Sequence, residues 1–143
     1  MNECLKMEVR TPHIRRYSTT DLDSAFQLLT SNGWSHRIPD HLFLERLISA
    51  SQRVAVAVSK DKVIGFARAI TDGLSNGYLS MVVVTPEWRG QGIGKSLVKE
   101  VVSDDAGITW MLRASRSQAP EFFEKLGFAL SSDAMERVRK RTS

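Results

Sequence analysis

The residues best suited to chemistry lie in one stretch, Val82–Leu97, which reads V-V-V-T-P-E-W-R-G-Q-G-I-G-K-S-L. An apolar β-type run ends at Thr85-Pro86, a glycine-rich basic turn follows, and a helix is predicted to begin near Ile93. A helix N-terminus leaves backbone N–H groups unpaired and carries positive partial charge, so it suits a phosphate. Three glycines alternate in this turn: Gly90, Gly92 and Gly94. Glycines let a ligand approach the backbone closely and tolerate positive φ. The stretch therefore predicts a pyrophosphate site.

Two other glycine-loop classes fit this stretch poorly. Gly94-Lys95-Ser96 reproduces the end of a P-loop, but Arg89 occupies the position of the required first glycine. No acidic metal-binding strand stands out downstream either. The dinucleotide fingerprint needs G-x-G-x-x-G, whereas the spacing here is G-x-G-x-G and lies in mid-chain.

Apolar periodicity and capping signals predict one strand and two helices before residue 50. The strand is expected near Ile14–Tyr17, and a helix with Thr20 as N-cap runs to about Thr30. Asn32-Gly33 ends that helix, and Pro39 lies in the first turn of the next one.

Three strands are then predicted to form an antiparallel meander. Arg53–Ser59 is β-rich, turns at Lys60–Lys62, and is followed by Val63–Ile70 as its hairpin partner. Tyr78–Val84 is the third member and leads directly into the glycine turn.

The last part of the chain is predicted to add one parallel strand, one short helix and an edge strand. Ile108–Leu112 follows the helix that begins near Ile93, and this crossover favours parallel pairing. Ser117 caps a short helix that ends at Gly127, and Met135–Val138, with Phe128, supplies a final edge strand. The element order predicts one α+β domain.

Two motifs resemble those of the GNAT superfamily of acyl-CoA N-acyltransferases. Arg89–Gly94 is similar to its [QR]-x-x-G-x-[GA] loop, and Ala119–Phe128 is similar to its A-x-x-[FL]-Y-E-K-x-G-F signature. The resemblance covers about residues 12–138 and implies a mixed, mostly antiparallel twisted sheet of six to seven strands with about four helices. Residues 1–11 would be a loose leader, and 12–143 a single N-acetyltransferase domain.

The resemblance implies acetyl-CoA as acyl donor and an amine as acceptor. Amides of the loop would bind the pyrophosphate, Arg89 and Lys95 would add countercharge, helped by Lys99, and Ser96 would donate its hydroxyl. The strand Val82–Val84 would hydrogen-bond the pantetheine arm, and one of its amides would polarise the thioester carbonyl. The implied cofactor-binding residues are Val82, Val83, Val84, Arg89, Gly90, Gln91, Gly92, Ile93, Gly94, Lys95, Ser96 and Phe123.

The acid and base of the transfer are not evident. The tyrosine that often protonates the leaving thiolate in the family is replaced by Phe123, which would pack against the pantetheine or acyl group, or in the core. The thiolate can instead leave and take a proton from water. No carboxylate lies in Tyr78–Val82, so the remaining candidates are weak: His36, Asp72, Glu87 and Ser115. Asp72 precedes Gly73, so a turn-forming role is the alternative.

The acceptor side carries weaker signals. Four residues could line a pocket for an acidic or aromatic amine: Trp34, Arg68, Tyr78 and Arg113. A CoA-binding module without catalysis is a second class, favoured by Phe123 and the missing strand carboxylate. A nucleic-acid binder is a third, favoured by the basic tail Arg137–Arg141, although a solubilising terminus explains that tail.

Composition limits the remaining classes. With 42% hydrophobic and 25% charged residues among 143, the chain is of ordinary globular type, and its net charge of +4 favours an anionic ligand. One cysteine, Cys4, excludes an internal disulfide, and no apolar run approaches 18 residues. We expect a cytoplasmic protein that can form a homodimer. We expect it to bind no metal, no membrane and no nucleic acid.

Overall fold

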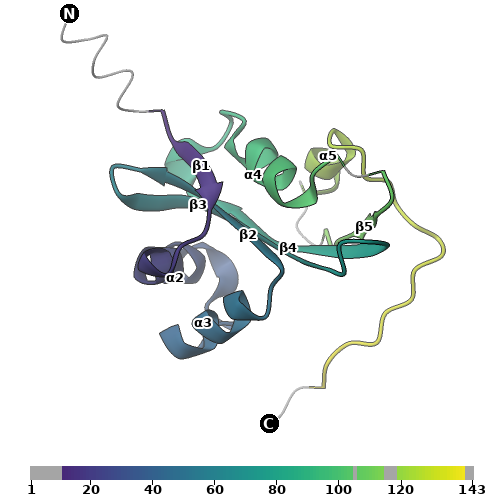
Figure 1. Cartoon of the computed structure of the whole chain (residues 1–143), viewed down its shortest axis with the longest axis horizontal. Helices are drawn as coiled ribbons and strands as arrows, with labels where there is room; N and C mark the ends of the chain where they lie inside the picture. Colours follow the sequence, from purple (N-terminus) through teal and green to yellow (C-terminus); the bar gives the residue numbers. More distant parts are fainter. Residues whose placement is uncertain (1–10, 105, 115–118, 141–143) are drawn as a thin grey trace, which may run out of the picture. The chain divides into compact units, whose positions relative to one another are not determined.

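The computed structural model describes residues 11–104, 106–114 and 119–140. The chain forms two compact units, Met1–Arg113 and Ala114–Ser143. Within its described part, the first unit holds a five-stranded sheet of order β1-β2-β3-β4-β5 (Figure 1). The first four strands pair antiparallel and β5 pairs parallel to β4. The strands are β1 His13–Arg16, β2 Arg53–Ser59, β3 Lys62–Thr71, β4 Asn76–Val84 and β5 Thr109–Met111.

Helices cover both faces of this sheet. The helices α2 (Leu22–Leu29) and α3 (His41–Ser49) lie on one face, and α4 (Ile93–Val102) lies on the other (Figure 1). Neighbouring residues of β3 face opposite sides of the sheet. Phe66 packs with the α2 and α3 side chains. A Cβ at the neighbouring Gly65 would lie 2.9 Å from Leu97 of α4. Glycine at this position therefore lets α4 lie close to the sheet.

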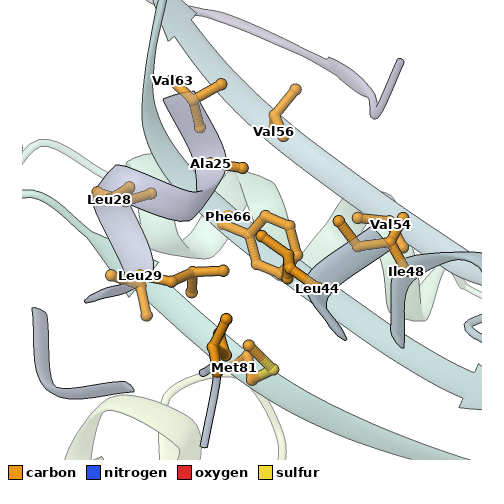
Figure 2. Packing of buried hydrophobic residues seen from close by; sticks show 12 residues of the cluster. Ala25, Leu28, Leu29, Leu44, Ile48, Val54, Val56, Val63, Phe66 and Met81 are labelled. Carbon is orange, nitrogen blue, oxygen red and sulfur yellow. The ribbon is translucent and has the colours of Figure 1, made fainter. Parts of the chain in front are cut away.

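The larger core lies between the sheet and the helices α2 and α3. Phe66 is fully buried at its centre, and apolar side chains from both helices and from β2, β3 and β4 surround it (Figure 2). Burial of apolar area at about 25 cal/mol per Å² is the main force that holds these elements together. The labelled members are Ala25, Leu28, Leu29, Leu44, Ile48, Val54, Val56, Val63, Phe66 and Met81.

The predicted α+β class and the order of the first nine helices and strands are confirmed, and so is the parallel pairing of the strand after α4. The predicted number of six to seven strands is wrong for the described residues, which contain five. The edge strand at Met135–Val138 is also wrong, because this segment has no strand structure. Met135 is 99% exposed, so burial of its side chain does not contribute to a strand there.

Two predicted helix starts are corrected. A short 3-10 helix, η1 (Thr19–Asp21), precedes α2, and Ser18 rather than Thr20 is its N-cap. Asp40 caps α3 by accepting the N–H of Phe43 at 2.8 Å, so Pro39 lies before the helix and not in its first turn. In both places a nearby Ser or Asp was the better capping residue.

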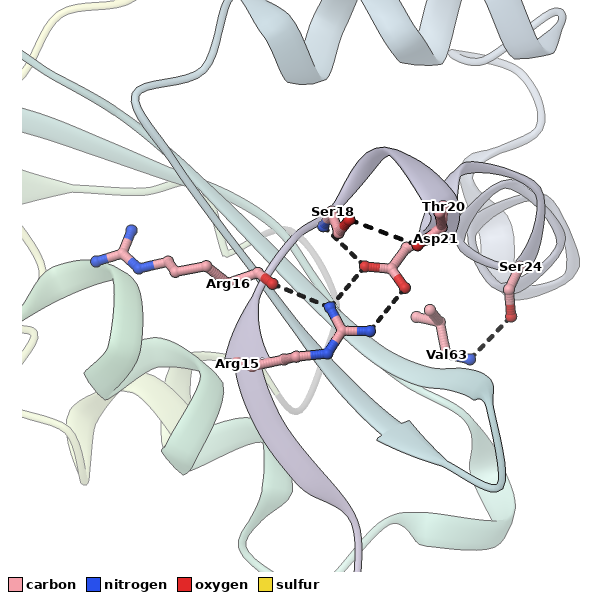
Figure 3. Close-up of polar contacts among 7 residues, drawn as sticks. All are labelled: Arg15, Arg16, Ser18, Thr20, Asp21, Ser24 and Val63. Atoms are coloured by element: carbon pink, nitrogen blue, oxygen red, sulfur yellow. Dashed lines mark hydrogen bonds and ion pairs between the residues drawn. The ribbon is translucent and has the colours of Figure 1, made fainter.

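Asp21 joins this helix start to β1. Its carboxylate accepts the backbone N–H of Ser18 at 2.8 Å and two guanidinium N–H groups of Arg15 at 2.8 and 2.9 Å (Figure 3). The hydrogen bond from Arg15 holds the pKa of the Asp21 carboxyl below its ordinary value. Nearby, the Ser24 hydroxyl accepts the N–H of Val63 at 2.8 Å, which ties α2 to β3 (Figure 3).

The substitution Asp21→Asn should therefore lower stability in a pH-dependent way. A carboxyl with a lowered folded-state pKa stabilises above its unfolded pKa of about 4, and this contribution is lost as pH falls through the folded pKa. We expect a loss of about 1–3 kcal/mol in urea unfolding at pH 7 and a smaller difference from the parent near pH 3. Asp61→Asn, in an exposed turn, is the control; an equal loss for Asp21→Asn at both pH values would contradict this prediction.

The second unit contains a short helix, α5 (Ala119–Glu124). Phe123 packs edge to face with Phe122 and Phe128, at ring-centroid distances of 4.9 and 5.8 Å. The helix ends at Glu124, three residues before the predicted end, and a hydrogen-bonded turn leads to Gly127, whose φ is 95°. The predicted cap Ser117 and the catalytic candidate Ser115 lie outside the described residues, as does most of the predicted leader.

Candidate active site

A bulge in β4 is the feature that distinguishes this strand from its neighbours. Val83 lies opposite Phe66 and Ser80 lies opposite Arg68, so three steps along β4 match two along β3. Met81, inside the extra step, has φ 58°, a left-handed conformation that is uncommon for a residue with a Cβ. Strain of this kind, of order 1–3 kcal/mol, often marks a functional position.

The pairing of β4 with β5 ends before the bulge. β5 pairs with β4 only at Asn76, Gly77 and Tyr78. Within the described residues, the part of β4 from Leu79 to Val84 has no strand partner on that side. Thr85 donates its N–H to Ile64 of β3, so alternation of backbone groups directs those of Val84 toward the open edge. This edge can accept an extended chain as an added strand.

The glycine turn leads from this edge to the N-terminus of α4. Gly90 and Gly92 have φ 79° and 81°, and Gly92 is the N-cap of α4. A Cβ at either glycine would meet nothing within 4 Å, so the space over the turn is open. Ile93 is buried and holds the first turn of the helix against the sheet. Unpaired N–H groups of this first turn therefore face an open site that suits an anion.

The predicted cations lie at different distances from this site. Arg89 donates a hydrogen bond from Nε to the Val84 carbonyl at 2.8 Å and another from Nη2 to Asn32 Oδ1 at 3.4 Å. Lys95 is exposed in the first turn of α4, whereas Lys99 lies in its last turn. Arg89 and Lys95 thus flank the loop, and Lys99 is the more distant cation. The Ser96 hydroxyl donates to the Gly92 carbonyl at 3.1 Å, and Gln91 is exposed in the turn.

The far end of α4 is held by Arg53 of β2. Its Nη1 donates to the carbonyls of Val101 and Val102, at 2.9 and 3.4 Å, and its guanidinium lies 5.7 Å from the centre of the Trp110 ring. A cation at a helix C-terminus is favourable for the helix dipole. This contact fixes the helix whose other end forms the loop site.

Trp110 also packs directly on Gly77, its partner in β4. An alanine Cβ at Gly77 would lie 2.4 Å from two ring atoms of Trp110. We expect Gly77→Ala to displace the ring, to disturb the three-pair contact of β4 with β5, and to lower stability by about 1–3 kcal/mol in urea unfolding. The double variant with Trp110→Leu should recover much of this loss, since it removes the clash. A Gly77→Ala protein as stable as the parent would contradict the prediction.

The weak base candidates do not lie together. Asp72 forms a turn: Oδ1 accepts the N–H groups of Leu74 and Ser75 at 2.8 Å, and Oδ2 accepts the Ser75 hydroxyl at 2.6 Å. These hydrogen bonds hold the pKa of the Asp72 carboxyl well below its ordinary value, so it is a poor proton acceptor. The turn-forming alternative is thus favoured. His36 is exposed in the loop before α3, and Glu87 is exposed in η3 (Pro86–Trp88).

Among the acceptor candidates, Arg68 is half-buried on β3 and contacts Met81 of the bulge. Trp34 packs against the main core, and its Nε1 is buried without a hydrogen-bond partner in the described part of the chain. Tyr78 is the last residue of β4 that pairs with β5. Arg113 follows β5.

A hollow of about 380 Å³ lies on the α2 side of the sheet. It is bordered by the end of α2, the β2–β3 turn and the segment after β4, and Lys60, Lys62, Glu87 and Trp88 are among its lining residues. Val82–Val84 and the glycines do not line it. The open edge of β4 and the glycine turn therefore lie outside this hollow.

Metal-binding clusters and membrane-spanning helices are both absent from the part of the chain that the structure describes. In the described ranges, no group of three or more His, Cys, Asp or Glu side chains is arranged to hold a metal ion. Over the same ranges, no helix is long and apolar enough to cross a membrane.

Comparison with known proteins identifies the family. The family described as "Acetyltransferase (GNAT) domain" matches residues 50–130, more than half of the chain. The chain therefore belongs to the GNAT acetyltransferase family and is an N-acyltransferase by class.

Individual relatives agree with this assignment. The chain is 28% identical to the N-acetyltransferase ycf52 of Pyropia yezoensis over 138 residues, 93% of this chain and 79% of that protein. It is 28% identical to serotonin N-acetyltransferase 2, chloroplastic, of Oryza sativa subsp. japonica over 129 residues, 85% of this chain but only 64% of that protein. A GNAT-family acetyltransferase of Streptococcus pneumoniae superposes with a TM-score of 0.77 at 24% identity, covering 93% of this chain and all of that one, so the two share a fold.

The bulge is the part of the site that sequence reasoning missed. Tyr78–Val84 was predicted as a plain strand, and its alternating burial agrees with that pattern. Positive φ usually requires glycine or asparagine, and Met81 gives no such signal. The register between β3 and β4 and the positive φ of Met81 reveal it.

Proposed function

We propose that this chain transfers the acetyl group of acetyl-CoA to a primary amine of a small molecule or peptide by direct attack of the amine on the thioester. The observation that carries the proposal is the continuous path from the bulge, along the open edge of β4, to the N-terminus of α4. An elongated ligand with a pyrophosphate at one end and an amide-containing arm at the other fits such a path.

The residues along this path have separable tasks. Loop amides between Gly90 and Lys95 would bind the pyrophosphate, with Arg89 and Lys95 lowering the local negative potential. The N–H of Val84 would hydrogen-bond the pantetheine arm. An amide N–H at the bulge would polarise the thioester carbonyl, which bound acetyl-CoA supplies as an activated acyl group.

Proton transfer would rely on water. The attacking amine must lose a proton, and neither the bulge nor the neighbouring part of β4 carries a carboxylate or imidazole. His36 and Glu87 are exposed, so either would act through ordered water as base. The CoA would leave as a thiolate and take a proton from solvent to become the free thiol, since Phe123 has none to give.

A thiol-release screen tests the proposal. Saturable acetyl-CoA binding should be accompanied by release of free CoA thiol with at least one amine from a panel of amino acids, polyamines, aminoglycosides, arylamines, serotonin and lysine peptides. Comparing acetyl-CoA with longer acyl-CoA donors tests the acyl preference. Saturable binding without thiol release over the whole panel would sink the transferase proposal, and absence of binding would sink the cofactor assignment as well.

A further inference from the structure

Arg68 is a half-buried cation without an acidic partner. Its Nη1 donates to the Ser51 hydroxyl at 3.1 Å and its Nε lies 3.2 Å from the Met81 sulfur, and both partners are neutral. In the described part of the chain, carboxylates pair with Arg15 and Arg16, whereas none lies within 4.0 Å of Arg68. Burying a charge without a counter-charge is costly, and burial lowers the pKa of this guanidinium.

The position of this guanidinium relates it to the proposed reaction. Arg68 lies opposite Ser80 in the sheet and contacts Met81, so it adjoins the bulge where the thioester would lie. It projects from the same face of β3 as Phe66, the face that α2 and α3 cover. Burial lowers the pKa of Arg68, and Tyr78, two residues from Ser80, partly offsets that lowering. A group bound here would lie within a few bonds of an amine at the thioester.

The chemistry of arginine specifies the group. The guanidinium has five N–H donors in a planar fork, and two of its nitrogens have partners among the described residues. Such a fork binds a carboxylate with two parallel hydrogen bonds, more strongly than a neutral acceptor. An uncharged or cationic amine would leave the guanidinium without a counter-ion.

We infer that Arg68 binds the carboxylate of the acceptor, and that the acceptor is a small amino acid carrying this carboxylate next to the amine that is acetylated. The inference rests on the proposed function, because it concerns the amine acceptor of the same reaction. It narrows that function from primary amines in general to amino acids.

Pairs of amines that differ only in the carboxylate provide the test. Thiol release is measured for phenylalanine against phenethylamine, leucine against isopentylamine, and histidine against histamine, with the parent and Arg68→Gln. We expect the parent to favour at least one amino acid over its decarboxylated partner by about tenfold or more in kcat/KM. Arg68→Gln should lower kcat/KM for that amino acid about 10- to 100-fold and leave its partner within about twofold.

Two further variants keep the result interpretable. Arg46→Gln removes the same charge from an exposed position on α3 and should change neither member of a pair. Met81→Asp places a carboxylate beside Arg68 while keeping the arginine, and it should reduce the preference for the amino acid by competing for the guanidinium. Equal use of both members of every pair by the parent, or an equal loss for both in Arg68→Gln, would overturn the inference while leaving amine acetylation intact.

Direct binding separates the inference from the proposed function. Amino acid binding in the presence of CoA is measured by calorimetry with the parent and Arg68→Gln. Binding that requires Arg68, without thiol release from any pair or from any amine of the wider panel, would support the carboxylate site and overturn the transferase proposal. Neither binding nor thiol release with any amino acid would overturn the carboxylate site.

Discussion

Replacing Arg89 by glutamate should weaken acetyl-CoA binding about a hundredfold or more. The substitution removes a charge-assisted contact worth about 1.5–3 kcal/mol and places a like charge near the pyrophosphate. At 4–6 Å and an effective dielectric constant near 20, that repulsion is about 3–4 kcal/mol before solvent screening of an exposed loop reduces it. Calorimetric titration with acetyl-CoA measures the change.

Three comparisons make this result specific. Arg89→Gln keeps the neutral part of the side chain and should weaken binding only about tenfold, since it removes attraction without adding repulsion. Lys99→Glu makes the same two-unit charge change in the last turn of α4 and should have the smaller effect. Arg89 also donates to Val84 and Asn32, so the melting temperature of each variant is measured to separate lost folding from lost binding. If Arg89→Glu binds acetyl-CoA as tightly as the parent does, the loop is not a pyrophosphate site.

The sequence predicted the regular parts of this molecule well because local chemistry determines them. Arg53–Ser59 was predicted with the bounds observed for β2, since an apolar β-branched run followed by a polar turn has few alternatives. The start of α4 at Ile93 was predicted because glycines with positive φ precede an apolar stripe of helical period.

The errors arise where several residues compete for one local role or where a distant partner decides. Ser18, Thr20 and Asp21 are all capping residues, and the double contact of Asp21 with Arg15 of β1 favours the earlier start. Met135–Val138 carries two apolar residues in an otherwise polar segment, and periodicity over four residues does not establish a strand.

The candidate site likewise has one part that the sequence predicted and one part that it did not. The shape of the loop was predictable because its glycines and the apolar stripe of α4 are visible in sequence. That this loop binds a pyrophosphate stays a prediction. The bulge at Met81 and the isolation of Arg68 depend on the register of β4 against β3, which no local pattern encodes. Those two features determine where the thioester and acceptor would lie, so the acceptor was the least predictable part of the function.

The largest expected effect on stability is that of Phe66→Ala. Phe66 is fully buried between the sheet and the helices α2 and α3, and its ring contacts side chains from several elements (Figure 2). Truncating a buried phenylalanine removes its transfer free energy and leaves a cavity, at a cost of about 3–5 kcal/mol. Since domains of this size are stable by about 5–15 kcal/mol, the variant should retain only a small margin, with a melting temperature lower by about 10 °C.

Ile70→Ala is the matched control, because Ile70 lies on the same strand but is 43% exposed. Its loss in urea unfolding should be about 1 kcal/mol or less. Phe66 is also the partner of Val83, directly beside the bulge, so a collapse around the cavity should disturb the open edge of β4. Phe66→Leu, which refills most of the volume, should then recover both stability and acetyl-CoA affinity. Equal losses for Phe66→Ala and Ile70→Ala would mean that the core between the sheet, α2 and α3 does not carry the stability of the fold.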